Sequence, residues 1–121
     1  MKKTNPNSNL KDSNLDREQY LYLTTRGRKS NRPREIEIWF TQRDGRFYLI
    51  AEYPTSHWLR NLQADPAASI RVAGENNNVR ARLVDRETEP ELHRFIAEIS
   101  RQKYGWGDGT VVELVPHSLR S

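Results

Sequence analysis

Basic and hydroxyl side chains gather in one short stretch of the chain that could bind an anion. Five cations fall within the nine positions from Arg26 to Arg34, and Ser30 lies among them. Gly27 and Pro33 are residues that favour turns. Guanidinium, ammonium and hydroxyl groups, together with free backbone N–H groups, can surround one phosphate or carboxylate. The stretch predicts either an anion-binding turn or, since charge runs are common on surfaces, a solvated hairpin tip.

The positive charge of the protein is concentrated in this turn. The 121-residue chain has 20 Lys and Arg residues against 16 Asp and Glu residues, a net charge of +4. Without the five cations of the turn, the count is 15 against 16, or −1. The positive excess is therefore local, and it does not extend over a long basic groove of the kind that binds nucleic acid.

Composition sets the size of the core and excludes several kinds of site. The length indicates one domain, and the 35% hydrophobic content indicates a small core that a partner subunit could complete. The absence of cysteine excludes disulfides, thiolate metal sites and cysteine nucleophiles. His57, His93 and His117 are scattered, so no metal site is expected. No apolar run is long enough to cross a bilayer, and no apolar region follows Lys2 and Lys3 as in a secretory signal, so a cytoplasmic protein is expected.

Alternating and β-rich runs predict a mainly β fold around the turn. Six strands are expected, over residues 19–25, 35–40, 47–51, 68–72, 79–84 and 110–115. Residues 43–46 have the composition of a tight hairpin, and residues 74–78 are typical of a long turn. Such a small antiparallel sheet is expected to curl into a barrel, because closure removes its free edges.

Two helices are expected between these strands. The first has its cap at Thr55 or Ser56, presents the apolar residues of 58–62 on one side and ends near Pro66. The second begins at the capping-box sequence of residues 88–91 and runs to about Lys103. Its expected buried face consists of Leu92, Phe95, Ile96 and Ile99.

The single domain is expected over residues 18–116. Residues 1–17 are rich in Asn, Lys, Ser and Asp and predict a flexible arm, and residues 117–121 form a short polar tail. An alternative for the arm is a short amphipathic turn around Leu10–Leu15 that packs only in a complex.

Two blocks of this sequence together resemble the deazaflavin-dependent nitroreductase and quinone reductase family. The likeness covers about residues 20–115. It implies the fold of the flavin-reductase-like superfamily, a six-stranded antiparallel split β-barrel with two inserted helices, and commonly a homodimer. The first block consists of Leu23–Ser30, Pro33-Arg34, Trp39-Phe40 and Asp44-Gly45, and the second is the run WLRNLQADP over residues 58–66.

The resemblance also implies a cofactor and the residues that bind it. The cofactor is the 8-hydroxy-5-deazaflavin coenzyme F-420 or, as in relatives, FMN. The backbone of the third expected strand lies along its ring system, at Ile50, Ala51 and Glu52. Trp58 and Asn61 lie near the ring and the chain that joins it to the phosphate. The residues that match the phosphate-binding positions are Arg28, Lys29, Ser30 and Arg34.

The residues themselves leave simpler roles open for the two helical positions. Trp58 could equally be a core residue, because its spacing is that of a buried helix face. Asn61 could equally bond a neighbouring carbonyl.

The chain departs from the family around the expected ring site. Family members that bind deazaflavin usually have Lys-Gly-Gly and a longer loop after the third strand, where this chain has EYPTSH over residues 52–57. Glu52 adds a carboxylate where an anionic reduced ring would be disfavoured. Residues 103–106, KYGW, stand in place of the tyrosine-rich stretch that closes the substrate pocket in nitroreductases. The match is therefore closer at the phosphate end than at the ring end.

An oxidoreductase is the first function that these residues predict. It would transfer a hydride from a reduced deazaflavin or FMN to a small acceptor such as a quinone or a nitro compound. Tyr53, His57 and Tyr104 are candidates for a proton donor, and no residue is assigned a catalytic role.

Two functions of other classes compete with it. One is a non-catalytic protein that binds a flavin, another phosphorylated ligand or a haem-like cofactor in the same barrel. The other is nucleic-acid binding through the turn, with Tyr20, Tyr22 and Trp39 as stacking groups. The second is disfavoured because the cations occupy a turn rather than a groove.

Overall fold

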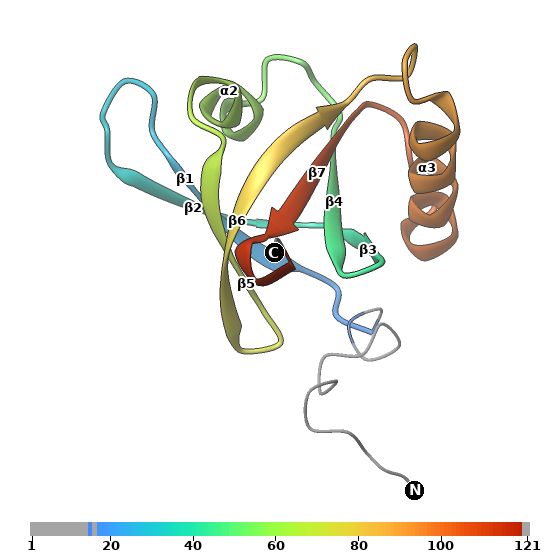
Figure 1. Cartoon of the computed structure of the whole chain (residues 1–121), viewed down its shortest axis with the longest axis horizontal. Helices are drawn as coiled ribbons and strands as arrows, with labels where there is room; N and C mark the ends of the chain where they lie inside the picture. The colour runs from blue at the N-terminus through green and yellow to red at the C-terminus, as the bar shows by residue number, and fades with distance from the viewer. Residues whose placement is uncertain (1–14, 16, 120–121) are drawn as a thin grey trace, which may run out of the picture.

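The described chain folds into one curled antiparallel sheet, and two helices lie against this sheet (Figure 1). The structure is a computed structural model, and it describes Leu15 and residues 17–119. Apart from Leu15 and Arg17, the expected arm and its alternative as an amphipathic turn lie outside the described residues. In chain order the elements are β1 (Leu21–Arg26), β2 (Pro33–Ile38), β3 (Thr41–Arg43), β4 (Arg46–Ala51), α2 (His57–Ala64), β5 (Ala67–Val72), β6 (Glu75–Val84), α3 (Pro90–Tyr104), β7 (Thr110–Pro116) and the short 3-10 helix η2 (His117–Leu119).

The sheet is split between its two outermost strands. The strand order is β2-β1-β5-β6-β7-β4-β3, so β2 pairs with β1 and β3 pairs with β4. Trp39 and Phe40 join β2 directly to β3, and the sheet curls so that the chain passes from one side of the split to the other. The predicted mainly β, split-barrel fold with two inserted helices is confirmed.

The expected strand over residues 35–40 is wrong in its extent. Strand β2 ends at Ile38, and the chain resumes as the separate strand β3, so the described residues form seven strands instead of six. The reason is a bend at two consecutive aromatic residues. Phe40 is buried, whereas Trp39 is 42% exposed. Alternation along the sequence predicts the strand but does not show where it changes its partner.

Two hairpins depend on left-handed backbone conformations. The predicted β3–β4 turn is present, with φ of 55° at Asp44 and 78° at Gly45. The long turn expected over residues 74–78 is wrong, because β6 already begins at Glu75. Ala73 and Gly74 make a two-residue turn with φ of 51° and 79°. The asparagines after it are taken into the ladder with β5, where pairing overrides their preference for turns.

Helix α2 lies where the sequence places it, between the cap position Ser56 and Asp65. Helix α3 begins one residue later than the expected capping box implies, because Glu89 occupies its cap position and Pro90 its first turn. No side chain caps its N-terminus. Within the described part of the chain, no helix is long and apolar enough to cross a membrane.

The buried face of α3 matches the expected one except at Phe95. Phe95 is 43% exposed and lies under the Arg43 guanidinium, 4.4 Å from the ring centroid. Leu92 and Ile99 are partly buried and pack against the same cluster as Ile96. The fully buried residues of the helix are His93, Ile96, Ala97 and Ser100.

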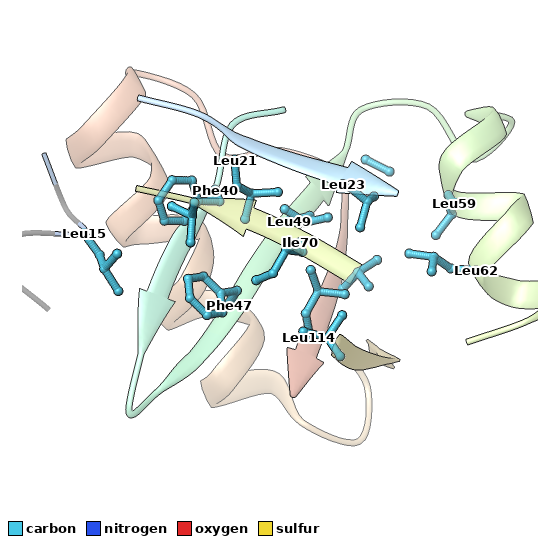
Figure 2. Packing of buried hydrophobic residues seen from close by; sticks show 14 residues of the cluster. Leu15, Leu21, Leu23, Phe40, Phe47, Leu49, Leu59, Leu62, Ile70 and Leu114 are labelled. Carbon is cyan, nitrogen blue, oxygen red and sulfur yellow. The ribbon is translucent and has the colours of Figure 1, made fainter. Parts of the chain in front are cut away.

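The main core fills the inside of the curled sheet. Figure 2 shows Leu59 and Leu62 of α2 pointing toward strand residues such as Leu23, so this helix covers one end of the core. Leu15 also packs in this cluster. A second cluster lies between the sheet and α3 and contains Tyr48 and Ile96. The two helices thereby fix the ends of β1 and β4, where the expected site residues lie.

Candidate functional site

A cavity of about 620 Å³ lies between the loop after β1, strand β2 and helix α2. We name it the turn cavity. Six of the residues that the resemblance assigns to cofactor binding come together here, although they come from two separate segments of the chain. They are Arg28, Lys29, Ser30, Arg34, Trp58 and Asn61.

The loop of the turn cavity is closed by its own backbone. The N–H of Gly27 donates to the carbonyl of Arg32, and the N–H of Asn31 donates to the carbonyl of Gly27, both at 2.8 Å. The hydroxyl of Ser30 accepts from the N–H of Arg32 at 3.2 Å. A Cβ at position 27 would lie 2.5 Å from that hydroxyl oxygen. Glycine therefore gives the Ser30 side chain its place in the loop.

Asn61 ties this loop to helix α2. Its side chain is buried, and its Oδ1 accepts from the backbone N–H and from the Nη1 of Arg28, at 3.2 and 2.8 Å. Its Nδ2 donates to Thr25 Oγ1 at 3.1 Å. The expected alternative, a bond to a neighbouring carbonyl, is not what the described structure contains. Asn61 therefore fixes both the end of β1, through Thr25, and the loop, through Arg28.

Two of the five cations of the turn are held by neighbours. Arg28 uses Nη1 on Asn61, and its Nη2 lies 3.3 Å from His57 Nδ1. Arg26 donates to the carbonyl and to the Oδ1 of Asn31. These contacts fix the shape of the turn.

Two other cations are left without partners at the cavity. Lys29 and Arg34 line it and form no hydrogen bond or ion pair with any described residue. The carboxylate of Glu35, which also lines the cavity, is paired with Arg71 at 3.3 Å. The turn cavity therefore presents unneutralised positive charge next to the hydroxyl of Ser30. Such a set of groups suits a phosphate or a carboxylate.

Trp58 serves the core and the cavity together. It is partly buried and packs against the main core, and it also lines the turn cavity. Both expected roles of this residue are therefore compatible with its place.

A second cavity, of about 510 Å³, lies at the other end of β2. We name it the aromatic cavity. It lies among the bend at Trp39 and Phe40, the end of β4 and the end of α3, and the rings of Trp39 and Tyr104 stack in it with centroids 4.3 Å apart. Its lining includes Tyr20, Glu37, Trp39, Ile50, Glu52 and Tyr104.

The expected ring-binding segment belongs to this second cavity rather than the first. Ile50 and Glu52 line the aromatic cavity, whereas the side chain of Ala51 is buried in the main core. Strand β2 connects the two cavities: Glu35 and Ile36 line the first, and the next two residues line the second.

The three candidate proton donors lie in different surroundings. The hydroxyl of Tyr104 accepts from the N–H of Phe40 at 3.0 Å and lies 2.9 Å from the carbonyl oxygens of Gln19 and Phe40. His57 lies in the turn cavity beside Arg28. Tyr53 is exposed. The structure does not bring them together, and Tyr104 is a support for the bend at Phe40.

Glu113 is a buried ionisable residue that the sequence reasoning missed. It lies in β7, is 1% exposed, and accepts from Tyr48 Oη at 2.8 Å, Arg82 Nε at 3.0 Å and Arg46 Nη1 at 3.3 Å. Arg82 also pairs with Glu89. The available signal was one glutamate within the apolar run of β7, VVELV.

The hydrogen bonds that Glu113 accepts favour the ionised form of its carboxyl. Burial acts to raise the pKa of its carboxyl, but the bonds from Arg82 and Tyr48 outweigh burial, so this pKa is lower than usual. The pKa of Tyr48 is raised by burial and by its bond to Glu113. Tyr48 also lines the aromatic cavity. The Glu113 carboxylate therefore positions Tyr48, which forms part of the cavity wall, through the hydrogen bond that it accepts from Tyr48.

Metal binding finds no support in the described part of the chain. No group of three or more His, Asp or Glu side chains there could hold a metal ion. His93, which is buried against the sheet, has its pKa lowered by burial and by the nearby charge of Arg86.

The fold is shared with several solved structures. The heme storage protein HutZ from Vibrio cholerae is 18% identical with a TM-score of 0.70, over 90% of this chain and 89% of that chain. An F420-H2 dependent reductase, FDR-A, is 20% identical with a TM-score of 0.57, over 79% of this chain and 93% of that chain. A protein described as a domain-swapped dimer is 22% identical with a TM-score of 0.57, over 83% of this chain and 81% of that chain. At these identities the structures show the fold alone.

A comparison with family models gives a more specific result. No curated protein is similar to the sequence at a significant level. The model described as F420H(2)-dependent quinone reductase matches residues 5–112, which include both cavities. The match extends over most of the chain and confirms the resemblance carried by the turn and by the run in α2. The chain therefore belongs to the F420H(2)-dependent quinone reductase family.

Proposed function

We propose that the protein binds the deazaflavin coenzyme and transfers a hydride from its reduced form to a small acceptor, such as a quinone or a nitro compound. Membership of the family indicates an oxidoreductase of this kind. The observation that carries the proposal for this chain is the pair of unpartnered cations, Lys29 and Arg34, at the turn cavity. Their charge suits the phosphate of such a cofactor.

The residues of the turn cavity fit the anionic end of the coenzyme. Lys29, Ser30 and Arg34 would hold the phosphate, and Arg28 would join them in the orientation that Asn61 gives it. Trp58 would provide an apolar wall beside the joining chain. When bound, a reduced deazaflavin supplies the hydride, and the protein contributes orientation and a water-poor surface.

The geometry of β2 supports a place for the ring at the edge of the aromatic cavity, beside the stacked rings of Trp39 and Tyr104 and not over them. A strand rises about 3.3 Å per residue, so Arg34 and Ile38 are roughly 13 Å apart along β2. An extended ligand with its phosphate at the turn could therefore reach the backbone beside Ile50 and Glu52. In this proposal Ala51 contributes its backbone alone, because its side chain belongs to the core.

A homodimer is part of the same proposal. The protein described as a domain-swapped dimer shares this fold. Tyr20, Trp39, Tyr53, Leu83 and Phe95 are large apolar side chains exposed on the single chain, and a partner subunit would cover some of them.

A non-catalytic ligand-binding protein is the second candidate. One observation favours it: the three candidate proton donors are not gathered at one site. HutZ, described as a heme storage protein, shares the fold without being described as a reductase. FMN or another phosphorylated ligand would then occupy the turn cavity.

The test is a side-by-side titration of the full chain with the deazaflavin coenzyme and with FMN, followed by fluorescence. We expect tight binding of the deazaflavin. In the double variant Lys29→Ala/Arg34→Ala, the affinity should fall about a hundredfold, because two charge-assisted bonds are lost. The matched control is Arg32→Ala/Arg80→Ala, which removes two exposed cations outside the cavity lining and should change affinity by less than about threefold.

The outcomes separate the candidates. Binding of the deazaflavin followed by oxidation of its reduced form with a quinone or nitro compound would support the oxidoreductase. Binding without turnover would favour the non-catalytic protein. If neither cofactor binds, or if both double variants lose affinity equally, the turn cavity is not the cofactor site.

A further inference from the structure

We infer that the aromatic cavity is a binding site for a planar organic cation, and that the acceptor of the proposed reaction belongs to this chemical class. The first part rests on the cavity alone. The second part rests on the proposed function.

The rings of the aromatic cavity form a fixed flat surface. Trp39 is 42% exposed, yet its ring is held parallel to that of Tyr104, with an angle of 6° between the planes. Tyr104 is in turn held by hydrogen bonds with the backbone of Phe40. Tyr20 and Trp106 add two further rings to the lining. Aromatic rings stack on flat ligands, and their faces attract cations.

The charge of the cavity is negative, although the whole chain has a net charge of +4. Its lining includes Glu37 and Glu52, and no Lys, Arg or His. Glu37 accepts a hydrogen bond from Tyr22 Oη at 3.0 Å, and neither carboxylate forms an ion pair with a described residue. Lys103 lies close by: its Nζ donates to the carbonyl of Phe40 at 3.1 Å and lies 4.0 and 5.1 Å from the ring centroids of Phe40 and Tyr104, which leaves Trp39 as the ring face open to a ligand cation. With its charge included, the two carboxylates still leave a balance of −1.

The aromatic rings and the two carboxylates together favour a planar cation over a neutral molecule or an anion. A neutral quinone would use the rings but would gain nothing from Glu37 and Glu52. An anion that lacks the phosphate contacts of the turn cavity would be repelled by both. A planar cation gains from the ring faces and from the carboxylates together, which is how proteins recognise quaternary ammonium groups.

Hydride transfer would change the charge of the bound cation, and this change would favour release of the product. A cation such as N-methylphenazinium accepts a hydride ion with its two electrons at a ring nitrogen and becomes a neutral dihydro compound. The reduced deazaflavin gives up this hydride and one further proton, which passes to solvent, so atoms, electrons and charge balance. The neutral product no longer interacts favourably with the two carboxylates. We therefore expect it to leave more readily than the substrate binds.

The test compares two flat molecules of nearly the same shape. The full chain without coenzyme is titrated at pH 8 with N-methylacridinium, a permanent cation, and with acridine, which is neutral at this pH, while tryptophan fluorescence is followed. The cation should bind at least tenfold more tightly. The double variant Glu37→Gln/Glu52→Gln should lose that preference, with the affinity for acridine unchanged within about twofold.

A matched control and a location control accompany it. Glu75→Gln/Glu91→Gln removes two exposed carboxylates outside the cavity and should keep the preference for the cation. Trp39→Leu should weaken binding of both molecules, because it removes the stacking surface. Equal binding of cation and neutral molecule would overturn the inference. So would binding of neither, or a preference that survives the Glu37 and Glu52 changes.

Turnover distinguishes the two parts of the inference. With the coenzyme present, N-methylphenazinium should be reduced faster than a neutral quinone by the unchanged chain, and the advantage should disappear in Glu37→Gln/Glu52→Gln. A cation that binds but is not reduced, while a quinone is, would overturn the acceptor assignment. If no acceptor is reduced, the proposed function fails, and the binding result stands or falls by the titration.

Discussion

The turn cavity and the aromatic cavity lie at the two ends of β2. One buried polar side chain positions the wall of each cavity: a neutral amide at the first and a carboxylate at the second. Asn61, a neutral amide, fixes the first through hydrogen bonds to Thr25 and to the backbone N–H and guanidinium of Arg28. Glu113 fixes the second from behind, through Tyr48, and it does so as a carboxylate. The excess charges differ as well: cations are left unpaired at the first cavity and carboxylates at the second.

The comparison teaches that the two cavities depend on solution conditions in different ways. A neutral amide keeps its hydrogen bonds throughout the ordinary pH range. A carboxylate keeps its bonds to arginine only while it is ionised. The anchor of the turn cavity should therefore not depend on pH, whereas the support of the aromatic cavity should weaken below about pH 4.5.

The largest loss of stability is expected when Glu113, the charged residue behind the aromatic cavity, is replaced. Glu113→Gln should lower the free energy of unfolding by about 1.5–3 kcal/mol at pH 7, because bonds to charged partners are lost in a buried place. The folded-state pKa of Glu113 is lower than usual, so its contribution is complete above the unfolded pKa near 4.5 and is lost as pH falls toward the folded pKa. Urea denaturation at several pH values measures this.

The difference between the unchanged chain and Glu113→Gln should accordingly narrow below about pH 4.5. Glu75→Gln, an exposed position, serves as the control and should change stability by less than about 0.5 kcal/mol. A difference that is constant from pH 7 down to pH 3 would show that Glu113 acts by shape rather than by charge.

A smaller effect is expected when the neutral support is removed. Asn61→Leu keeps the size of the side chain but leaves Thr25 and the N–H of Arg28 without a partner, at a cost of roughly 1–2 kcal/mol. The loss should be the same from pH 5 to pH 8, and affinity for the coenzyme should fall with it. Gln63→Leu, an exposed position in the same helix, should leave both quantities nearly unchanged. A loss of stability with full coenzyme affinity would separate the loop anchor from the site.

The smallest effect concerns the stacked rings. Tyr104→Phe keeps the ring against Trp39 but removes the hydroxyl that bonds the backbone of Phe40, at a cost of about 0.5–1.5 kcal/mol. The preference for N-methylacridinium should persist, since the ring and both carboxylates remain. Titration of this variant, with Tyr104→Leu as the comparison that also removes the ring, measures the share of stacking. Equal affinities in the two variants would mean that the stack does not shape the cavity.

Local patterns predicted most of the fold. Alternation, turn composition and the helical spacing in residues 58–62 placed β4, β7 and α2 and the hairpin at Asp44, because each depends on neighbours in sequence. The break between β2 and β3 could not be predicted, since it depends on which strand lies beside Phe40 after folding. The start of β6 was missed for a similar reason, because pairing with β5 decides it.

The candidate site was predicted only in part, because its supports are contacts between distant residues. The resemblance assigned six residues that line the turn cavity, but the partners of Asn61 lie 33 and 36 residues away. Tyr48 and Glu113 are 65 residues apart. The resemblance assigned Ile50, Ala51 and Glu52 by their backbone, and it did not indicate that the side chain of Ala51 is buried while Ile50 and Glu52 line the aromatic cavity.

Strand β2 has a consequence for aggregation. Within the described residues it pairs only with β1, so its other edge has no strand beside it. Edges of this kind can pair with other chains unless charges interrupt them. Arg34, Glu35 and Glu37 along β2 are such charges, and they also line the two cavities. These charged residues of the cavities therefore also oppose self-association of the chain through the edge of β2. Binding measurements on variants that neutralise them should be accompanied by light scattering, which detects aggregates.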